Sequence, residues 1–93
     1  MSSVKVAHLR EQGQDMLLFP LSDLFGSKSG SEQNSILAEL ERRAHRAGLA
    51  GKAAAFWETG GRTYFRGPRP WFSFLQSISF ATVWANVNRE ISW

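Results

Sequence analysis

The sequence predicts an α+β domain whose two β-hairpins form a four-stranded antiparallel sheet with helices packed on one face. Two pairs of short, alternating apolar segments predict the hairpins, because alternation in period two is typical of half-buried strands. A capped segment with helical spacing follows the first pair, and two shorter helical segments follow the second pair. The predicted order is therefore ββα-ββαα, which an antiparallel sheet with helices on one face accommodates.

The first hairpin is predicted close to the amino terminus. Residues 4–10 alternate between apolar and polar side chains, and residues 15–19 are strongly apolar. A two-residue turn that ends at Gly13 places Arg10 opposite Asp15, so that opposite charges face each other across the strands. The proline that follows lacks a backbone donor and is expected to end the second strand or to lie at a sheet edge.

The long helix is the most clearly specified element. A Ser- and Gly-rich loop over residues 22–31 precedes it, and Ser29 with Glu32 fits a capping box at its start. The helix is expected to run to about Ala47, because Gly48 is a typical helix stop. Apolar residues at helical spacing form one stripe: Ile36, Leu37, Leu40, Ala44 and Ala47.

The second hairpin is predicted from a third strand over residues 52–58 and a fourth over residues 62–66. The Gly-Gly loop between them tolerates the positive φ angles of a type I′ turn. Counting outward from this loop gives the cross-strand pairs: Glu58 with Thr63, Trp57 with Tyr64, Phe56 with Phe65, and Ala55 with Arg66.

Two helices are expected to complete the chain. Pro70 suits the first turn of a short helix over residues 71–78. Ser79 can cap a second helix. Its predicted apolar stripe consists of Phe80, Val83, Trp84, Val87 and Ile91.

Length and composition indicate one folded domain, predicted to span residues 1–93. The content of 43% hydrophobic and 20% charged residues is typical of a folded soluble protein rather than a disordered segment. There are no cysteines, which excludes disulfides, thiolate metal sites and cysteine nucleophiles. The sequence shows no signal-peptide pattern and no apolar run that could span a membrane, so the expected location is the cytoplasm.

Catalytic and metal-binding residues are not predicted. Only His8 and His45 could act as a base near neutral pH, and neither has a nucleophile or carboxylate at a recognisable spacing. The carboxylates are scattered, so no metal-ligand motif is present, and the glycines match no phosphate-binding fingerprint. The interpretation is a packed His8 and a solvated His45 in a protein that is not an enzyme and uses no cofactor.

The candidate binding face lies on the second hairpin, in the part of the chain that holds ten of the twelve aromatic residues. The predicted register places Trp57, Arg62, Tyr64 and Arg66 on one face, away from the face of the two phenylalanines. If the phenylalanines enter the core, an aromatic–arginine patch stays exposed. Trp93 is a further candidate, because a terminal aromatic residue either docks into the domain or contacts a partner.

Three interpretations of this patch are open from the sequence. Helices can cover it, with the arginine stems lying along its edge. It can instead be a protein interface, where Trp, Tyr and Arg are enriched. As a third interpretation, its rings stack on bases and its guanidinium groups bind phosphates of a single-stranded nucleic acid. The net charge of +3 permits an acidic partner without demanding one.

The predicted function is that of a small soluble binding module, of unknown process, which acts by protein–protein contact including self-association. The alternative is a single-stranded nucleic-acid-binding module that uses the second hairpin. The expected partner is a protein or a second copy of the chain, with no membrane, metal or cofactor involved.

Overall fold

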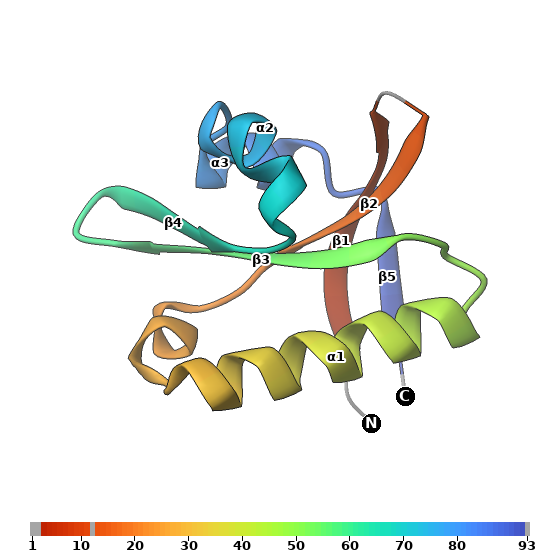
Figure 1. Cartoon of the computed structure of the whole chain (residues 1–93), viewed down its shortest axis with the longest axis horizontal. Coiled ribbons are helices and arrows are strands. Elements are labelled where there is room, and N and C mark those ends of the chain that lie inside the picture. The colour runs from red at the N-terminus through yellow and green to blue at the C-terminus, as the bar shows by residue number, and fades with distance from the viewer. Residues whose placement is uncertain (1–2, 12, 93) are drawn as a thin grey trace.

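The computed structural model describes residues 3–11 and 13–92, which form a five-stranded sheet with helices on both sides (Figure 1). The strands are β1 (Ser3–Glu11), β2 (Gln14–Pro20), β3 (Lys52–Thr59), β4 (Arg62–Arg66) and β5 (Arg89–Ser92). The α-helices are α1 (Gly30–Arg46), α2 (Phe72–Gln76) and α3 (Phe80–Ala85), and two short 3-10 helices are η1 (Asp23–Ser27) and η2 (Arg69–Trp71).

The sheet is mixed, in the order β4-β3-β2-β1-β5. Neighbouring strands are antiparallel except β2 and β3, which are parallel. The α+β class is thus confirmed, but the prediction of four antiparallel strands is wrong. The helix α1 crosses over the sheet between β2 and β3, and such a crossover brings the second strand back in the same direction as the first.

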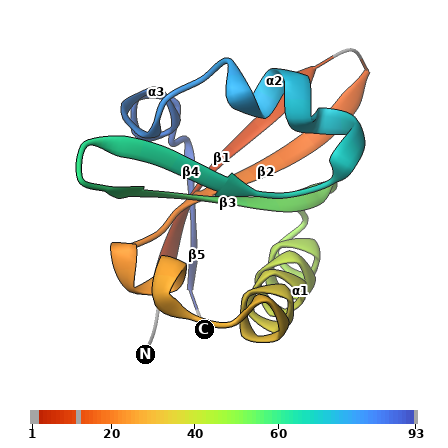
Figure 2. The same cartoon turned by 60° about the vertical axis from the view of Figure 1, so that its left-hand side comes forward.

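Helices cover both faces of the sheet, so the prediction that they pack on one face is also wrong. Figure 2 shows α1 on one side, with α2 and α3 on the other. The reason lies in β2, which buries Leu17 and Phe19 on the α1 side and Met16 and Leu18 on the opposite side. A central strand that is apolar on both faces needs cover on both faces.

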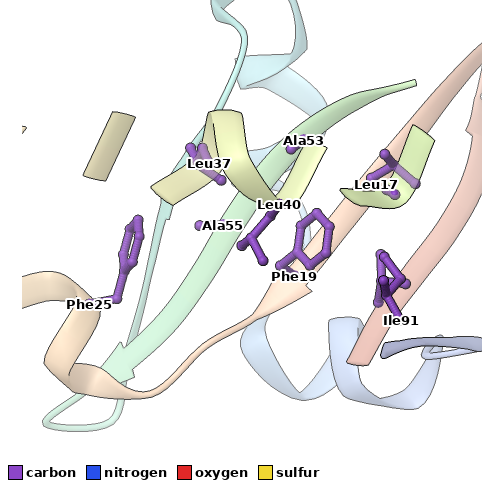
Figure 3. Close-up of a cluster of buried hydrophobic side chains, with 10 residues drawn as sticks. Leu17, Phe19, Phe25, Leu37, Leu40, Ala53, Ala55 and Ile91 are labelled. Carbon is purple, nitrogen blue, oxygen red and sulfur yellow. The ribbon is translucent and has the colours of Figure 1, made fainter. Parts of the chain in front are cut away.

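The core on the α1 side joins α1, η1 and the sheet (Figure 3). Leu37 and Leu40 of α1 pack onto the sheet, and Phe25 closes one end of the cluster. The buried members are Val6, Leu17, Phe19, Phe25, Leu37, Leu40, Ala44, Ala53, Ala55 and Ile91. The small alanines of β3 let α1 approach the sheet closely.

The core on the opposite side is built on Phe56 of β3, which is fully buried. The short helices α2 and α3 contribute Leu75 and Val83. The buried members are Ala7, Met16, Leu18, Ala54, Phe56, Trp71, Leu75 and Val83. Within the described residues, no helix is long and apolar enough to cross a membrane.

The start of α1 confirms the predicted capping box. The backbone N–H of Glu32 donates to the Ser29 side chain, and the Ser29 N–H donates to the Glu32 carboxylate. The backbone hydrogen bond from Ser29 lowers the pKa of the Glu32 carboxyl group below its usual value. The helix ends at Arg46, and the predicted stripe is buried at Leu37, Leu40 and Ala44. Ile36 is half-buried and Ala47 is exposed.

Both hairpin registers are confirmed. In the first, Arg10 pairs with Asp15. In the second, the four predicted pairs are present, and a fifth pair between Thr59 and Arg62 closes the Gly-Gly turn. Both turn glycines have positive φ angles, 60° and 79°, as a type I′ turn requires.

The end of the chain differs from the prediction, because the last helix stops at Ala85 and Ile91 lies in a strand. The chain leaves α3 through Asn86, and β5 then pairs with β1 along the outer edge of the sheet. Asn88 extends this pairing with its side chain, which accepts from the His8 backbone N–H at 2.9 Å and donates to the His8 carbonyl at 3.0 Å. A strand with one buried residue also satisfies the apolar position at Ile91.

Candidate functional site

The second hairpin lies between the two helical layers, and β4 forms one edge of the sheet (Figure 2). Phe56 and Phe65 face α2 and α3, whereas Trp57, Tyr64 and Arg66 lie on the α1 side. The sequence left open whether helices cover the face of Trp57 and Tyr64 or leave it exposed. Helices lie over both faces, but the cover on the α1 side thins out toward β4.

Trp57 is only half-buried, and the Ser- and Gly-rich loop packs against it. The loop contains η1, whose buried Phe25 contacts Trp57 with ring centroids 5.1 Å apart. The Gln33 side chain donates to the Phe25 carbonyl at 2.9 Å, which ties η1 to α1. A Cβ atom on Gly26 would lie 2.3 Å from Nε1 of Trp57, so this close contact requires glycine. Apart from the apolar Phe25, the loop sequence contains no feature that predicts its packing against Trp57.

Tyr64 is the ring that this arrangement leaves open. Its ring stacks on that of Trp57, with a centroid distance of 6.0 Å and an interplanar angle of 14°. Tyr64 is 42% exposed. Phe25, Trp57 and Tyr64 therefore form a column that runs from the core to the surface. A ring supported in this way presents a rigid apolar contact at little entropic cost.

The two arginines of β4 differ in their surroundings. Arg62 is exposed beside the turn, whereas Arg66 is half-buried at the other end of the strand. The Arg66 Nε donates to Oδ1 of Asn34 on α1 at 2.8 Å. Among the described residues, no carboxylate lies within ion-pair distance of either arginine.

A groove of about 410 Å³ opens beside the end of β4. Gly67 lets the chain turn closely over the sheet there, since a Cβ atom would lie 2.8 Å from that of Ala54. The groove combines side chains of α1, β3, β4, η2 and α2: Asn34, Leu37, Ala53, Phe65, Arg66, Arg69 and Phe72, together with Gly67 and Pro68. Sequence reasoning missed Asn34, Arg69 and Phe72, because they come from three elements that only the fold brings together.

The outer edge of β4 adds backbone groups to this surface. No other strand of the described chain pairs with that edge. Thr59 and Arg62 flank the two-residue turn, so they form a hydrogen-bonded pair, and such pairs alternate along the hairpin. The N–H and C=O groups of Thr63 and Phe65 therefore point away from β3. We call Arg62, Tyr64, Arg66 and Phe72, with this open edge, the β4 surface.

Comparison of the chain with models of known families, with curated proteins and with solved structures found no match.

Other candidate residues lie elsewhere. His8 Nε2 is 3.7 Å from Asp15, and His45 Nε2 is 2.7 Å from the carbonyl of Gly51. Across residues 3–11 and 13–92, no cluster of three or more metal-binding side chains occurs. Trp93 lies outside the described residues, so its predicted partner contact stays a prediction.

The contact between η1 and Trp57 predicts the effect of adding one methyl group. Gly26→Ala is expected to destabilise the fold by about 1–3 kcal/mol, because the new Cβ atom must displace the Trp57 ring. The measurement is urea unfolding followed by circular dichroism. The matched control is Gly30→Ala, whose Cβ atom would meet Arg66 at an ordinary 3.5 Å and which should be neutral or stabilising. Equal unfolding midpoints for both variants would contradict the packing of Trp57 described here.

Proposed function

We propose that this protein is a small binding module that acts by protein–protein contact, including self-association, through the β4 surface. The observation that carries the proposal is the combination of an open strand edge with the supported, exposed ring of Tyr64. Tyrosine and arginine are enriched at the energetic centres of protein interfaces. A cytoplasmic, non-catalytic role is part of the proposal and is supported by the sequence alone.

The exposed rings around β4 support contact with a protein. Phe72 is 40% exposed and meets Phe65 edge to face at 5.4 Å, so an apolar ring flanks the strand on the side opposite to Tyr64. A partner that approaches β4 can therefore bury a ring on each side of the edge. Such burial excludes water from the backbone hydrogen bonds at the interface.

Binding of a single-stranded nucleic acid is the alternative, and one observation counts against it. Base stacking platforms use successive exposed rings. Here Trp57 lies half-buried beneath Tyr64 and Phe25, so on the α1 side of the hairpin Tyr64 is the ring that is open to solvent. The net charge of +3 also provides only a weak general attraction for phosphates.

Self-association and its response to salt test the proposal. The chain is expected to associate at micromolar concentration in sedimentation velocity, with little change between low and high salt. Tyr64→Ala should weaken association by roughly 2 kcal/mol or more, about thirtyfold in Kd, because it removes the exposed anchor. Trp57 is a poor target for this test, because its packing against the core couples binding to stability.

The matched control is Trp84→Ala. Trp84 is 45% exposed on α3, which lies on the face of the sheet opposite to Tyr64, so its removal should leave association unchanged. If Trp84→Ala rather than Tyr64→Ala abolishes association, the interface lies on α3 and the proposal is wrong. A strictly monomeric chain that binds oligothymidylate tightly, with affinity that falls steeply as salt rises, would favour the nucleic-acid alternative.

A further inference from the structure

We propose that the groove beside β4 is a carboxylate-binding site, which receives an acidic side chain of an extended partner segment that pairs with the open edge of β4. This inference rests on the proposed function and names the partner chemistry of the same surface. The inference is supported by three observations: the two arginines in the groove, the position of Asn34, and the direction of the β4 backbone groups.

A hydrogen bond orients the side chain of Arg66. Its Nε donates to Asn34, which orients the guanidinium group and leaves its terminal nitrogens for a further acceptor. Among the described residues, no carboxylate lies within ion-pair distance of Arg66. A guanidinium group that is already oriented binds a carboxylate through two parallel hydrogen bonds and loses little entropy in doing so.

The rest of the groove matches an anion with an apolar neighbour. Arg69, which is exposed, is a second cation in its lining, and no acidic residue is among the lining side chains. The nearby Glu41 already accepts a hydrogen bond from the backbone N–H of Ala53 at 2.8 Å. Leu37 and Phe72 supply apolar walls. A volume of about 410 Å³ falls within the usual range of ligand-binding clefts.

The open edge of β4 favours a peptide as the source of the carboxylate. The outward N–H and C=O groups of Thr63 and Phe65 alternate along the strand as an added β-strand requires. In such a pairing, the partner residue opposite Arg66 points its side chain to the α1 side, where the guanidinium group lies. The partner residue opposite Phe65 points to the other side, against Phe72. The expected partner therefore alternates acidic and apolar residues.

Pairing of β4 with β4 of a second copy is disfavoured, so self-association through the β4 surface is expected to use the exposed rings rather than the strand edge. If β4 paired with β4 of another copy about Tyr64, Arg62 of each copy would lie opposite Arg66 of the other, and like charges directly opposite are destabilising. If the added strand is acidic instead, its carboxylates attract both Arg62 and Arg66. Charge complementarity thus selects a different, acidic segment for the edge.

The test uses the full ¹⁵N-labelled chain and a synthetic peptide, acetyl-Ser-Glu-Val-Thr-Val-Glu-Ser-amide, whose pattern is the same in both strand directions. Binding is followed by NMR from the Arg66 Nε–Hε resonance and the Phe65 and Gly67 amides. All three are expected to shift and saturate together. The same peptide with glutamine in place of both glutamates should bind about tenfold or more weakly, because charge-assisted hydrogen bonds are lost.

Variants of the protein identify the site. Arg66→Gln should remove most of the affinity difference between the acidic and the glutamine peptide, while Arg62 keeps a weaker preference for the acidic one. The affinity of Arg66→Lys for the acidic peptide should lie between those of the unchanged protein and Arg66→Gln, because lysine keeps the charge but not the planar guanidinium group. The matched control is Arg46→Gln, which removes the same charge from the exposed end of α1 and should leave binding unchanged. Asn34→Ala should weaken binding and move the Arg66 Nε–Hε resonance while the unfolding midpoint stays the same.

The outcomes separate this inference from the proposed function. Equal binding of the two peptides, or an Arg66→Gln variant that binds normally, would overturn the carboxylate site. Self-association that depends on Tyr64 would then still support the protein-binding proposal. Saturable shifts at Arg66 with oligothymidylate or inorganic phosphate, but not with the acidic peptide, would also overturn the inference and assign the groove to phosphate.

Discussion

Replacing Phe56 with alanine is expected to lower the free energy of unfolding by about 3–5 kcal/mol, the typical cost of truncating a buried phenylalanine. Phe56 is fully buried on the central part of β3, beneath α2 and α3, and its ring contacts Phe65 at a centroid distance of 6.0 Å. Single domains are stable by only about 5–15 kcal/mol, so this loss would leave the chain close to its unfolding threshold.

Urea unfolding followed by circular dichroism measures the loss, and Phe72→Ala is the matched control. The same substitution is made at Phe72, but this residue is 40% exposed. The free energy of unfolding should therefore fall by about 1 kcal/mol, mainly because the edge contact with Phe65 is lost. Equal losses for the two variants would mean that the helices α2 and α3 do not seal the face of the sheet that Phe56 occupies.

Deleting residues 80–93 is expected to abolish cooperative folding. The deletion removes α3 and β5, so Val83 and Ile91 leave the two cores. It also exposes the edge of β1, where the Asn88 side chain makes two hydrogen bonds to the His8 backbone. An uncovered strand edge beside exposed apolar surface promotes aggregation. The expected result is a broad thermal transition with aggregates in sedimentation velocity.

A chain that ends at Ser92 is the control for this deletion. It keeps all four residue pairs between β1 and β5, so it should unfold cooperatively at nearly the midpoint of the whole chain. A deletion of residues 80–93 that stays monomeric and cooperative would mean that α3 and β5 are an appendage. Loss of self-association in the chain that ends at Ser92, with folding intact, would support the predicted partner contact of Trp93.

The elements that were predicted correctly depend on residues close together in the chain. The Ser29–Glu32 capping box and the Gly-Gly turn are complete within a few residues, so their geometry follows from local steric and hydrogen-bonding rules. Counting outward from the turn was then enough to predict the register of the hairpin. The last helix was overextended because the spacing that places Ile91 on a helical stripe also places it on the buried side of a short strand.

The candidate site was predicted in part. The register correctly placed Trp57, Tyr64 and Arg66 on one face of the hairpin, because alternation along a strand is a local property. It did not predict that η1 would cover Trp57, nor that Asn34, Arg69 and Phe72 would meet beside β4. The contacts of Phe25 with Trp57 and of Asn34 with Arg66 join residues 32 positions apart, and the chain between them carries no pattern that specifies this approach.

The α+β class, the two hairpin registers and the capped start of α1 are thus consequences of local sequence. The tertiary structure decided that α1 crosses over to make β2 and β3 parallel, that both faces of the sheet are covered, and that β4 keeps an open edge. The physical reason is that strands apolar on both faces must bury both, and α1 alone covers only one. The short helices α2 and α3 complete the burial on the opposite face. On the α1 side, the cover that α1 and η1 provide ends before β4, which leaves Tyr64 and the arginine groove at the surface.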